Sequence, residues 1–233
     1  MIKKLLLSAA IVTGATAGAF AQQYISLGPV VGIGQSFVTN DVYMDQVVIE
    51  RDLFKVGLKA WLAVMYSRKE HWGVGGEVLY SKIGYKKWYV TYVDSLTGAP
   101  VQSYNETNDA GYVQVPLRFY YFPGKYNTKA RAKAYIGPVF GFNLMEVQHR
   151  KALDGTLPPD LEDMPRYNSF DFGLQAGIGV NVYLAKSLWL NLDLNYYQGL
   201  TDALTDDRIR TGTNLNEHFG IQVGLLFGLG KQA

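Results

Sequence analysis

The sequence predicts an all-β protein: an eight-stranded, antiparallel, up-and-down transmembrane β-barrel that is closed and has a lumen filled by side chains. Three observations favour this fold. Eight segments of roughly 11 to 15 residues alternate between apolar and small or polar side chains, which suits the roughly 9 to 11 residues that a tilted strand needs to cross a bilayer. The connections between these segments are alternately short and long. No charged residue lies in the middle of an apolar face.

The first 21 residues predict a secretory signal peptide, which leaves residues 22–233 as a single predicted barrel domain. Lys3 and Lys4 precede a short apolar run, and Ala19-Phe20-Ala21 is typical of a cleavage site, so cleavage is expected between Ala21 and Gln22. The apolar run is shorter than the roughly 20 residues that a spanning helix needs. A buried N-terminal helix is the alternative.

The composition excludes several classes of function. The chain has no cysteine, so it has neither a disulfide framework nor a thiolate site. When Lys3 and Lys4 leave with the signal peptide, the 22 basic residues become 20, which equals the 20 acidic residues. A neutral chain without a basic stripe is not expected to bind nucleic acid.

The eight predicted strands share a period of two in which one parity is consistently apolar. In the seventh, for example, positions 188, 190, 192 and 194 are leucine, whereas 191, 193 and 195 are polar. The predicted strands are Tyr24–Val38, Phe54–Ser67, Trp72–Gly84, Tyr112–Phe122, Ala134–Met145, Phe170–Leu184, Leu188–Gly199 and His218–Gly228.

The composition of the two parities predicts which of them faces inward. The polar parity is rich in glycine, which suits the narrow interior of an eight-stranded barrel, so the apolar parity is expected to face lipid. The barrel must then close, because an open edge in hydrocarbon would leave backbone groups unpaired. Six charged residues lie within the strands on the inward parity, and we expect them to form a structural network in the lumen. They are Lys55, Lys59, Glu77, Arg118, Asp171 and Asp193.

Within this network, Lys59 and Glu77 are expected directly or diagonally opposite one another, because they lie on strands joined by a short turn.

The four long connections predict extracellular loops, because outer-membrane barrels have short periplasmic turns and longer external loops. These connections are Thr39–Leu53, Tyr85–Gly111, Glu146–Ser169 and Leu200–Glu217. An even number of strands then places both mature termini in the periplasm. Strand-like residues on both sides of "SLTG" also predict that the third and fourth strands continue outward as a hairpin with its turn near Gly98.

The two predicted ends of the barrel differ in charge. The external loops are rich in acidic residues, notably Asp160, Glu162, Asp163, Asp206 and Asp207. We expect them to bind a cationic partner or to bridge to lipopolysaccharide phosphates through divalent cations. The periplasmic segments are basic and are expected to favour anionic headgroups. They carry Arg68, Lys69, Lys125, Lys129, Arg131, Lys133, Lys186 and Lys231 against Glu70.

Five segments resemble the PorT-like outer-membrane β-barrel proteins of Gram-negative bacteria. These segments are "GGEVLYSKIGY", "GYVQVPLRFYYFP", "AYIGPVFGF", "FDFGLQAGIGV" and "LNYYQGLTD". The resemblance covers nearly the whole mature chain. It implies a location in the outer membrane and an accessory role in protein secretion.

Three functions remain open. A non-enzymatic structural or interaction role would use the four external loops. Its partners would be outer-membrane lipid and lipopolysaccharide, the barrel-assembly machinery, and a secretion component or surface protein. A lipid A-modifying or other barrel enzyme would need a histidine beside a nucleophile, for which Ser36 and His218 are the candidates. A narrow pore is the third, although Trp61, Tyr135 and Trp189 are expected to fill the lumen.

We expect no catalytic residue, cofactor or metal site, because no spacing typical of metal ligands or of nucleotide binding occurs.

Overall fold

The computed structural model describes residues 25–40, 49–67, 71–93, 96–97, 100–124, 129–154, 166–185, 187–205 and 213–229. The predicted signal peptide and its cleavage site at Ala21 and Gln22 lie outside these residues. No helix in the described part of the chain is long and apolar enough to cross a membrane.

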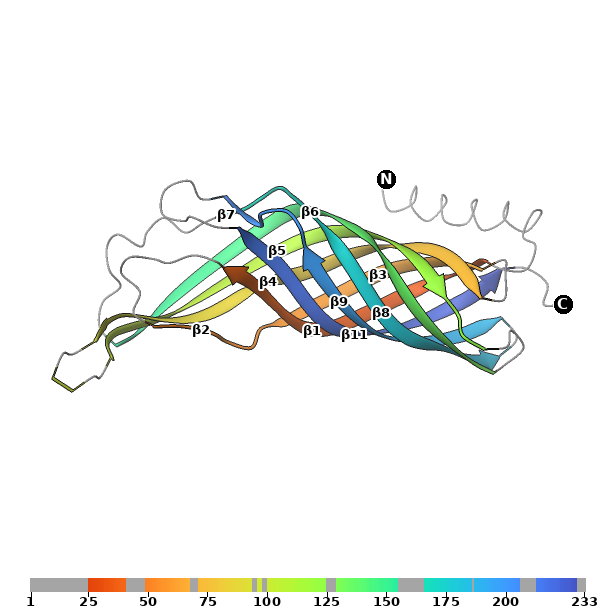
Figure 1. Ribbon diagram of the computed structural model, residues 1–233, viewed down its shortest axis with the longest axis horizontal. Coiled ribbons are helices and arrows are strands. Elements are labelled where there is room, and N and C mark those ends of the chain that lie inside the picture. The colour runs from red at the N-terminus through yellow and green to blue at the C-terminus, as the bar shows by residue number, and fades with distance from the viewer. Residues whose placement is uncertain are drawn as a thin grey trace, which may run out of the picture.

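Eight long strands form a ring (Figure 1). Each pairs antiparallel with the next long strand along the chain, and the first pairs with the last, so the all-β, up-and-down arrangement is confirmed. The long strands are β1 (Ile25–Asn40), β3 (Val56–Tyr66), β4 (Trp72–Val93), β5 (Pro100–Tyr121), β6 (Ala130–Asp154), β8 (Phe170–Ala185), β9 (Leu188–Gly199) and β11 (Asn214–Leu229). The short strands are β2 (Ile49–Asp52), β7 (Arg166–Tyr167) and β10 (Leu204–Thr205).

The ring has two different ends. At one end, Ile25 at the start of β1 pairs with Leu229 at the end of β11. We call this end the terminal end, because the first strand begins there and the last strand ends there. The strand ends that flank the short connections between β3 and β4, β5 and β6, and β8 and β9 lie at this end, toward the right of Figure 1. The strand ends that flank the long connections lie at the opposite end, which we call the loop end.

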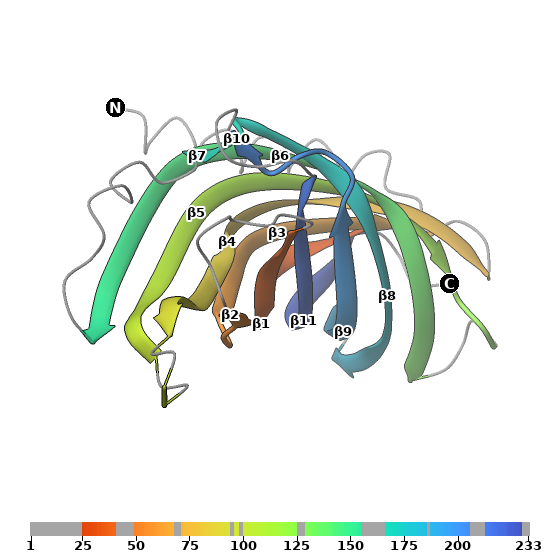
Figure 2. The same cartoon turned by 60° about the vertical axis from the view of Figure 1, so that its left-hand side comes forward.

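Three strands continue past the loop end and build an extension. β4 and β5 have 22 residues each and β6 has 25, and β2 pairs with β4, so the order across the extension is β2-β4-β5-β6. In Figure 2 these strands run together toward the lower left. The turn between β4 and β5 includes residues 96–97, which confirms the predicted hairpin.

The fifth predicted strand, Ala134–Met145, was too short at both ends. β6 starts at Ala130 and runs to Asp154, so the first part of the predicted loop Glu146–Ser169 is strand. The cause is the sequence at both ends of the strand. Arg131 and Lys133 look like part of a charged turn, and beyond Met145 both parities carry polar residues, which removes the apolar alternation that marks a strand facing lipid.

Apolar side chains cover the outside of the ring. In β11 the exposed residues are Phe219, Ile221, Val223, Leu225 and Phe227, and the residues between them are buried. The same alternation recurs along the other strands. This gives an outer apolar band and an inner polar face, as the two parities predicted.

Trp61 is the clear exception to the alternation. Its position in β3 lies between Lys59 and Ala63, which are both buried, yet 56% of Trp61 is exposed. Ala60 and Leu62 are exposed as well, so three consecutive residues of β3 are accessible. The expectation that Trp61 fills the lumen is therefore wrong. Leu79 and Val30, which lie opposite Trp61 on the flanking strands, are buried in its place.

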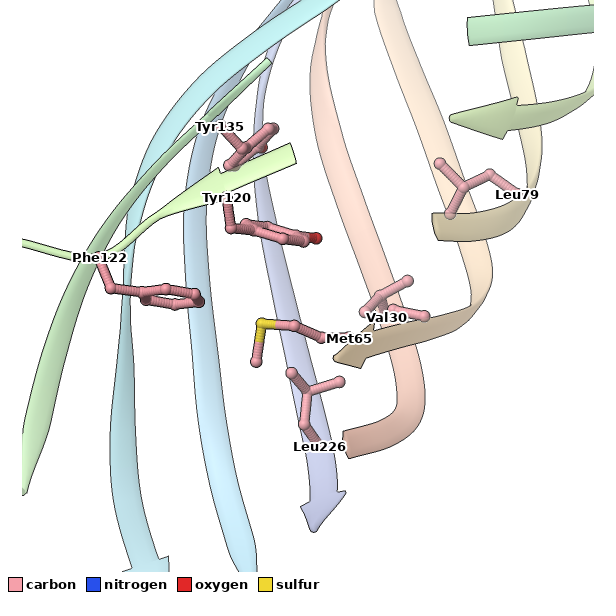
Figure 3. Close-up of a cluster of buried hydrophobic side chains, with 8 residues drawn as sticks. Val30, Met65, Leu79, Tyr120, Phe122, Tyr135 and Leu226 are labelled. Carbon is pink, nitrogen blue, oxygen red and sulfur yellow. The ribbon is translucent and has the colours of Figure 1, made fainter. Parts of the chain in front are cut away.

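Two clusters of buried apolar side chains lie inside the ring, one toward each end. The cluster toward the terminal end contains Tyr120, Phe122, Tyr135 and Met65, whose side chains point toward one another in Figure 3. Val30, Ala63, Leu79 and Leu226 complete it. The cluster toward the loop end includes residues from the connections, and its members are Val38, Ile83, Tyr85, Ala110, Tyr112, Tyr167, Ala203 and Leu204.

β7 and β10 help to cover the loop end of the interior. Leu204 of β10 pairs with Tyr167 of β7, and both side chains are buried in the loop-end cluster. Burial raises the pKa of the Tyr167 phenol well above its usual value, so the ring stays neutral at physiological pH. The buried charged and polar residues share the interior with these two apolar clusters.

Candidate functional site

The six charged residues predicted for the lumen are all buried, with at most 6% of any of them exposed. They do not form one continuous network in the described residues. Their hydrogen bonds divide them into separate groups, which are centred on Glu77 and Arg118, on Asp193, on Asp171 and on Lys55. Lys59 stands apart from these groups.

The first group is an ion pair that ties four strands together across the interior. Arg118 of β5 donates from Nη1 to Oε1 of Glu77 on β4. The Arg118 Nε and Nη2 atoms donate to Oε1 of Gln175 on β8, at 3.1 and 2.9 Å. Gln222 of β11 donates from Nε2 to the same Glu77 oxygen, at 2.8 Å. A guanidinium suits this role, because its fixed fork of donors can bind several acceptors at once.

The second group contains a cation whose predicted position is the periplasmic rim. Lys133 of β6 lies 2.9 Å from the Asp193 carboxylate of β9, and both side chains are almost fully buried. Asn191 donates to the same carboxylate at 2.8 Å. The Tyr135 ring lies between this group and the first, with Arg118 4.5 Å and Lys133 5.8 Å from its centroid. These contacts are cation–π interactions.

The third group surrounds a carboxylate near the loop end. Asp171 of β8 is fully buried, and it accepts hydrogen bonds from Tyr197 at 2.8 Å, Asn216 at 2.9 Å and Thr201 at 3.2 Å. These donors lie on β9, on β11 and in the connection that follows β9. Since hydrogen bonds to a buried carboxylate offset part of the loss of hydration, Asp171 fixes this connection over the end of the ring.

The fourth group depends on a glycine. Lys55 donates to the backbone oxygen of Asn108 and lies 2.6 Å from the carboxylate of Asp109. Gly84 lies beside these atoms, and an added methyl group there would clash with the backbone oxygen of Asn108 and lie 2.9 Å from the Lys55 ammonium. Gly84 also has a φ of +142°, a conformation that other residues rarely adopt. Glycine at this position therefore allows the positive φ and leaves room for Asn108 and Lys55.

The expected opposition of Lys59 and Glu77 is wrong. In the observed register Lys59 lies opposite Ser81, and Glu77 lies opposite Ala63. The two side chains are thus four positions apart along β4, because the short turn between β3 and β4 fixes a register that the alternation alone does not specify. No hydrogen bond of Lys59 is found within the described residues.

Ser36 and His218 lie opposite one another on β1 and β11, as the enzyme alternative requires. Their side chains do not form a nucleophile and base, however. The Ser36 hydroxyl donates to the backbone oxygen of Gly84 and accepts from its N–H, both at 3.0 Å. His218 is buried against Gly57, and its Nδ1 has no partner among the described residues.

Two basic residues that were assigned to the periplasmic rim belong to the interior. Arg131 and Lys133 are 9% and 4% exposed, and Arg131 lies over the ring of Phe122 at 3.7 Å. The basic rim is therefore smaller than predicted. Both residues share the parity of Tyr135, so extending the inward parity four residues upstream would have found them.

The acidic loop residues Asp160, Glu162, Asp163, Asp206 and Asp207 lie outside the described residues. Within the described part of the chain, no group of three His, Cys, Asp or Glu residues could hold a metal ion. The interior groups bind one another, and the chemistry they provide is the joining of strands across the ring.

Several solved outer-membrane proteins have a similar arrangement. OprG from Pseudomonas aeruginosa is 12% identical, with a TM-score of 0.43, over 88% of this chain and 96% of that protein. Ail from Yersinia pestis, solved with sucrose octasulfate, is 14% identical, with a TM-score of 0.37, over 88% of this chain and 99% of that protein. The neisserial surface protein NspA is 10% identical, with a TM-score of 0.37, over 88% of this chain and 96% of that protein.

A search of curated proteins finds no match to this chain. Residues 20–205 match the family described as "Outer membrane protein beta-barrel domain". This match covers well over half of the chain and agrees with the ring of strands, the outer apolar band and the polar interior. The chain belongs to the outer membrane protein β-barrel domain family.

Proposed function

We propose that this protein is a closed, integral outer-membrane barrel without enzymatic activity, which acts as a structural or interaction protein through its loop end. In this proposal residues 1–21 are removed on export, and both mature termini lie in the periplasm. The partners are lipopolysaccharide, the barrel-assembly machinery that inserts the protein, and a secretion component or surface protein bound by the four loops, as for PorT-like relatives.

The observation that carries the proposal is the contrast between the two faces of the ring. The outer face is an apolar band, as in Val31 at 58% exposed, whereas the inner face holds paired charges together with two apolar clusters. An exposed apolar band on this scale is typical of a surface covered by lipid or protein. A filled interior argues against a solute channel, since eight strands leave room only for side chains.

The arrangement of Ser36 supports a non-enzymatic role over the lipid A-modifying alternative. A serine nucleophile must present its hydroxyl to a base, and the Ser36 hydroxyl is instead bound by the Gly84 backbone. The discriminating measurement is mass spectrometry of lipid A from cells with and without the protein. We expect identical lipid A species, and a mass difference that disappears in His218→Ala would establish the enzyme.

Labelling in intact cells tests the orientation. The natural chain has no cysteine, so a single introduced cysteine is a unique label. Leu96 is 94% exposed at the tip of the extension, and Lys129 is exposed at the terminal end. A maleimide that cannot cross the outer membrane should label Leu96→Cys and leave Lys129→Cys unlabelled until the cells are lysed. The opposite result would refute the orientation.

Crosslinking from Leu96 in intact cells tests the partner. Capture of a component of a secretion system would support the accessory role that the PorT-like resemblance implies. Capture of lipopolysaccharide alone would restrict the function to the structure of the surface.

A further inference from the structure

The outward face of the extension carries a group of basic side chains. Register and alternation place Lys86 of β4, Thr107 of β5 and His149 of β6 in one row across this face. The next row outward contains Lys151, and the row nearest the ring contains Lys82. Because residues opposite one another in an antiparallel pair share a face, these side chains form one surface. We call it the outward basic face, and it comprises Arg51, Lys82, Lys86, His149 and Lys151.

The side chains of the outward basic face are accessible, and its lysines are not neutralised in place. Lys82, Lys151, His149 and Arg51 are exposed, and Lys86 is half-buried. No carboxylate forms an ion pair with Lys82, Lys86 or Lys151 within the described residues.

The nearby acidic side chains are already engaged. Asp109 lies among the basic rows and pairs with Lys55 at 2.6 Å. Asp52 of β2 lies opposite Lys87, toward the other face, and pairs with it at 3.7 Å. The outward basic face therefore carries an excess of positive charge, although the loops around it are acidic in sequence.

The outward basic face adjoins the outer apolar band directly. Lys82 lies opposite Leu58, which is 55% exposed, and two residues beyond Tyr80. On β6 the exposed Met145 and Val147 lead from the band to His149. Trp88, over which Arg51 lies at 5.8 Å, provides an amphipathic ring at the same level. Cations above an apolar band match a lipid that has anionic groups above its acyl chains.

The height of the outward basic face identifies the type of lipid. From Lys82 to Trp88 the strand rises about 20 Å along its axis, or about 14 Å along the membrane normal at a tilt near 45°. The headgroup layer of a phospholipid leaflet is only about 5–8 Å thick. A lipid with phosphates at several depths within a sugar region fits this height better.

We propose that the outward basic face binds the phosphate groups of lipopolysaccharide in the outer leaflet by direct charge pairing. The inference rests on the proposed function, because it requires the loop end to lie outside the cell. It differs from the expectation based on the acidic loops, in which divalent cations bridge carboxylates to phosphates. Direct pairing between lysine and phosphate needs no metal ion.

The test uses the full chain purified in detergent and measures its affinity for purified lipopolysaccharide. The variant Lys82→Gln/Lys86→Gln/Lys151→Gln removes three positive charges, and Lys129→Gln, exposed at the terminal end, is the control. Each basic residue near an anionic lipid surface strengthens binding about fivefold, so the triple variant should bind roughly 100-fold more weakly at low salt. The control should bind like the wild type, and EDTA should not change the affinity.

Two further probes define the ligand. Lipopolysaccharide whose phosphates have been removed should bind the wild type as weakly as intact lipopolysaccharide binds the triple variant. Vesicles of phosphatidylglycerol should bind more weakly than lipopolysaccharide and should distinguish the variants less. A shift in gel migration between boiled and unboiled samples checks that every variant is folded.

Several results would overturn the inference. The first is that the triple variant and the wild type bind lipopolysaccharide with equal affinity. The second is that the wild type binds dephosphorylated lipopolysaccharide, or phosphatidylglycerol vesicles, as tightly as intact lipopolysaccharide. The third is that EDTA abolishes binding. The labelling of Leu96→Cys separates the two proposals. If Leu96→Cys is not labelled in intact cells, the proposed orientation is wrong, and this inference, which depends on that orientation, is wrong as well. If it is labelled and the triple variant binds normally, only this inference fails.

Discussion

Replacing Glu77 with alanine would leave the Arg118 guanidinium inside the ring without its carboxylate. Both side chains are at most 2% exposed, so water cannot take the place of the lost group. Arg118 would keep its hydrogen bonds to Gln175, but Gln222 would lose its acceptor. Removing one partner of a buried ion pair costs about 3–5 kcal/mol, and we expect Glu77→Ala to lower the free energy of unfolding by this amount.

The change in the free energy of unfolding can be measured by titration with urea or guanidinium in detergent. Folded and unfolded chains migrate differently on a gel, so the gel gives the fraction unfolded at each concentration. Glu77→Gln should cost less, about 1–3 kcal/mol, because its amide oxygen still accepts a hydrogen bond. The double variant Glu77→Gln/Arg118→Met should be more stable than Glu77→Ala, since no unpaired charge remains inside.

Glu217→Ala serves as the control for this series. Glu217 accepts hydrogen bonds from Tyr196 and Thr39 on the outer surface, so its removal should cost less than about 1 kcal/mol. An unfolding curve of Glu77→Ala that coincides with that of the wild type would refute the structural role of the ion pair.

Three other substitutions test separate parts of the structure. Val31→Arg places a charge on the apolar band and should destabilise the protein in lipid by about 2–4 kcal/mol. Thr39→Arg, on the same face near the loop end, should cost less. Unfolding curves of the two variants in lipid vesicles measure the difference. Gly84→Ala should lower stability by about 1–3 kcal/mol, because alanine is strained at a φ of +142° and its methyl group would clash with the backbone oxygen of Asn108 and meet the Lys55 ammonium. Melting temperatures from the gel shift measure the loss, and an unchanged value would contradict this reasoning. Asp193→Asn leaves Lys133 without its carboxylate and should cost about 3 kcal/mol by denaturant unfolding, and Asp193→Asn/Lys133→Met should recover part of that loss.

The class of fold could be predicted from the sequence because lipid and a narrow interior impose a strict pattern on each strand. In Leu188–Gly199, for example, one parity is leucine from 188 to 194, whereas the other is polar from 191 to 195, and this contrast can be read without knowing the fold. The extended hairpin was predictable for a similar reason, since its turn and its flanking strands are close in sequence. Burial of the six charged residues followed from parity alone.

The length of β6 and the role of Lys133 were not predictable in this way. Outside the lipid both faces of β6 meet polar surroundings, so the alternation ends before the strand does. Lys133 looks like a turn residue until Asp193, sixty positions later, is found 2.9 Å away. The outward basic face depends likewise on register, which brings Lys86 and His149 into one row from strands far apart in the sequence.

The sequence by itself determined the number of long strands, the direction of their faces and the outer-membrane class, because each of these depends on the local alternation of side chains. Only the tertiary structure decided which charges are paired, that Trp61 departs from its parity, and that Ser36 is bound to Gly84 rather than to His218. These features depend on the relative positions of strands around the ring. The pattern within a single strand carries no information about those positions, because any shift by two residues preserves it.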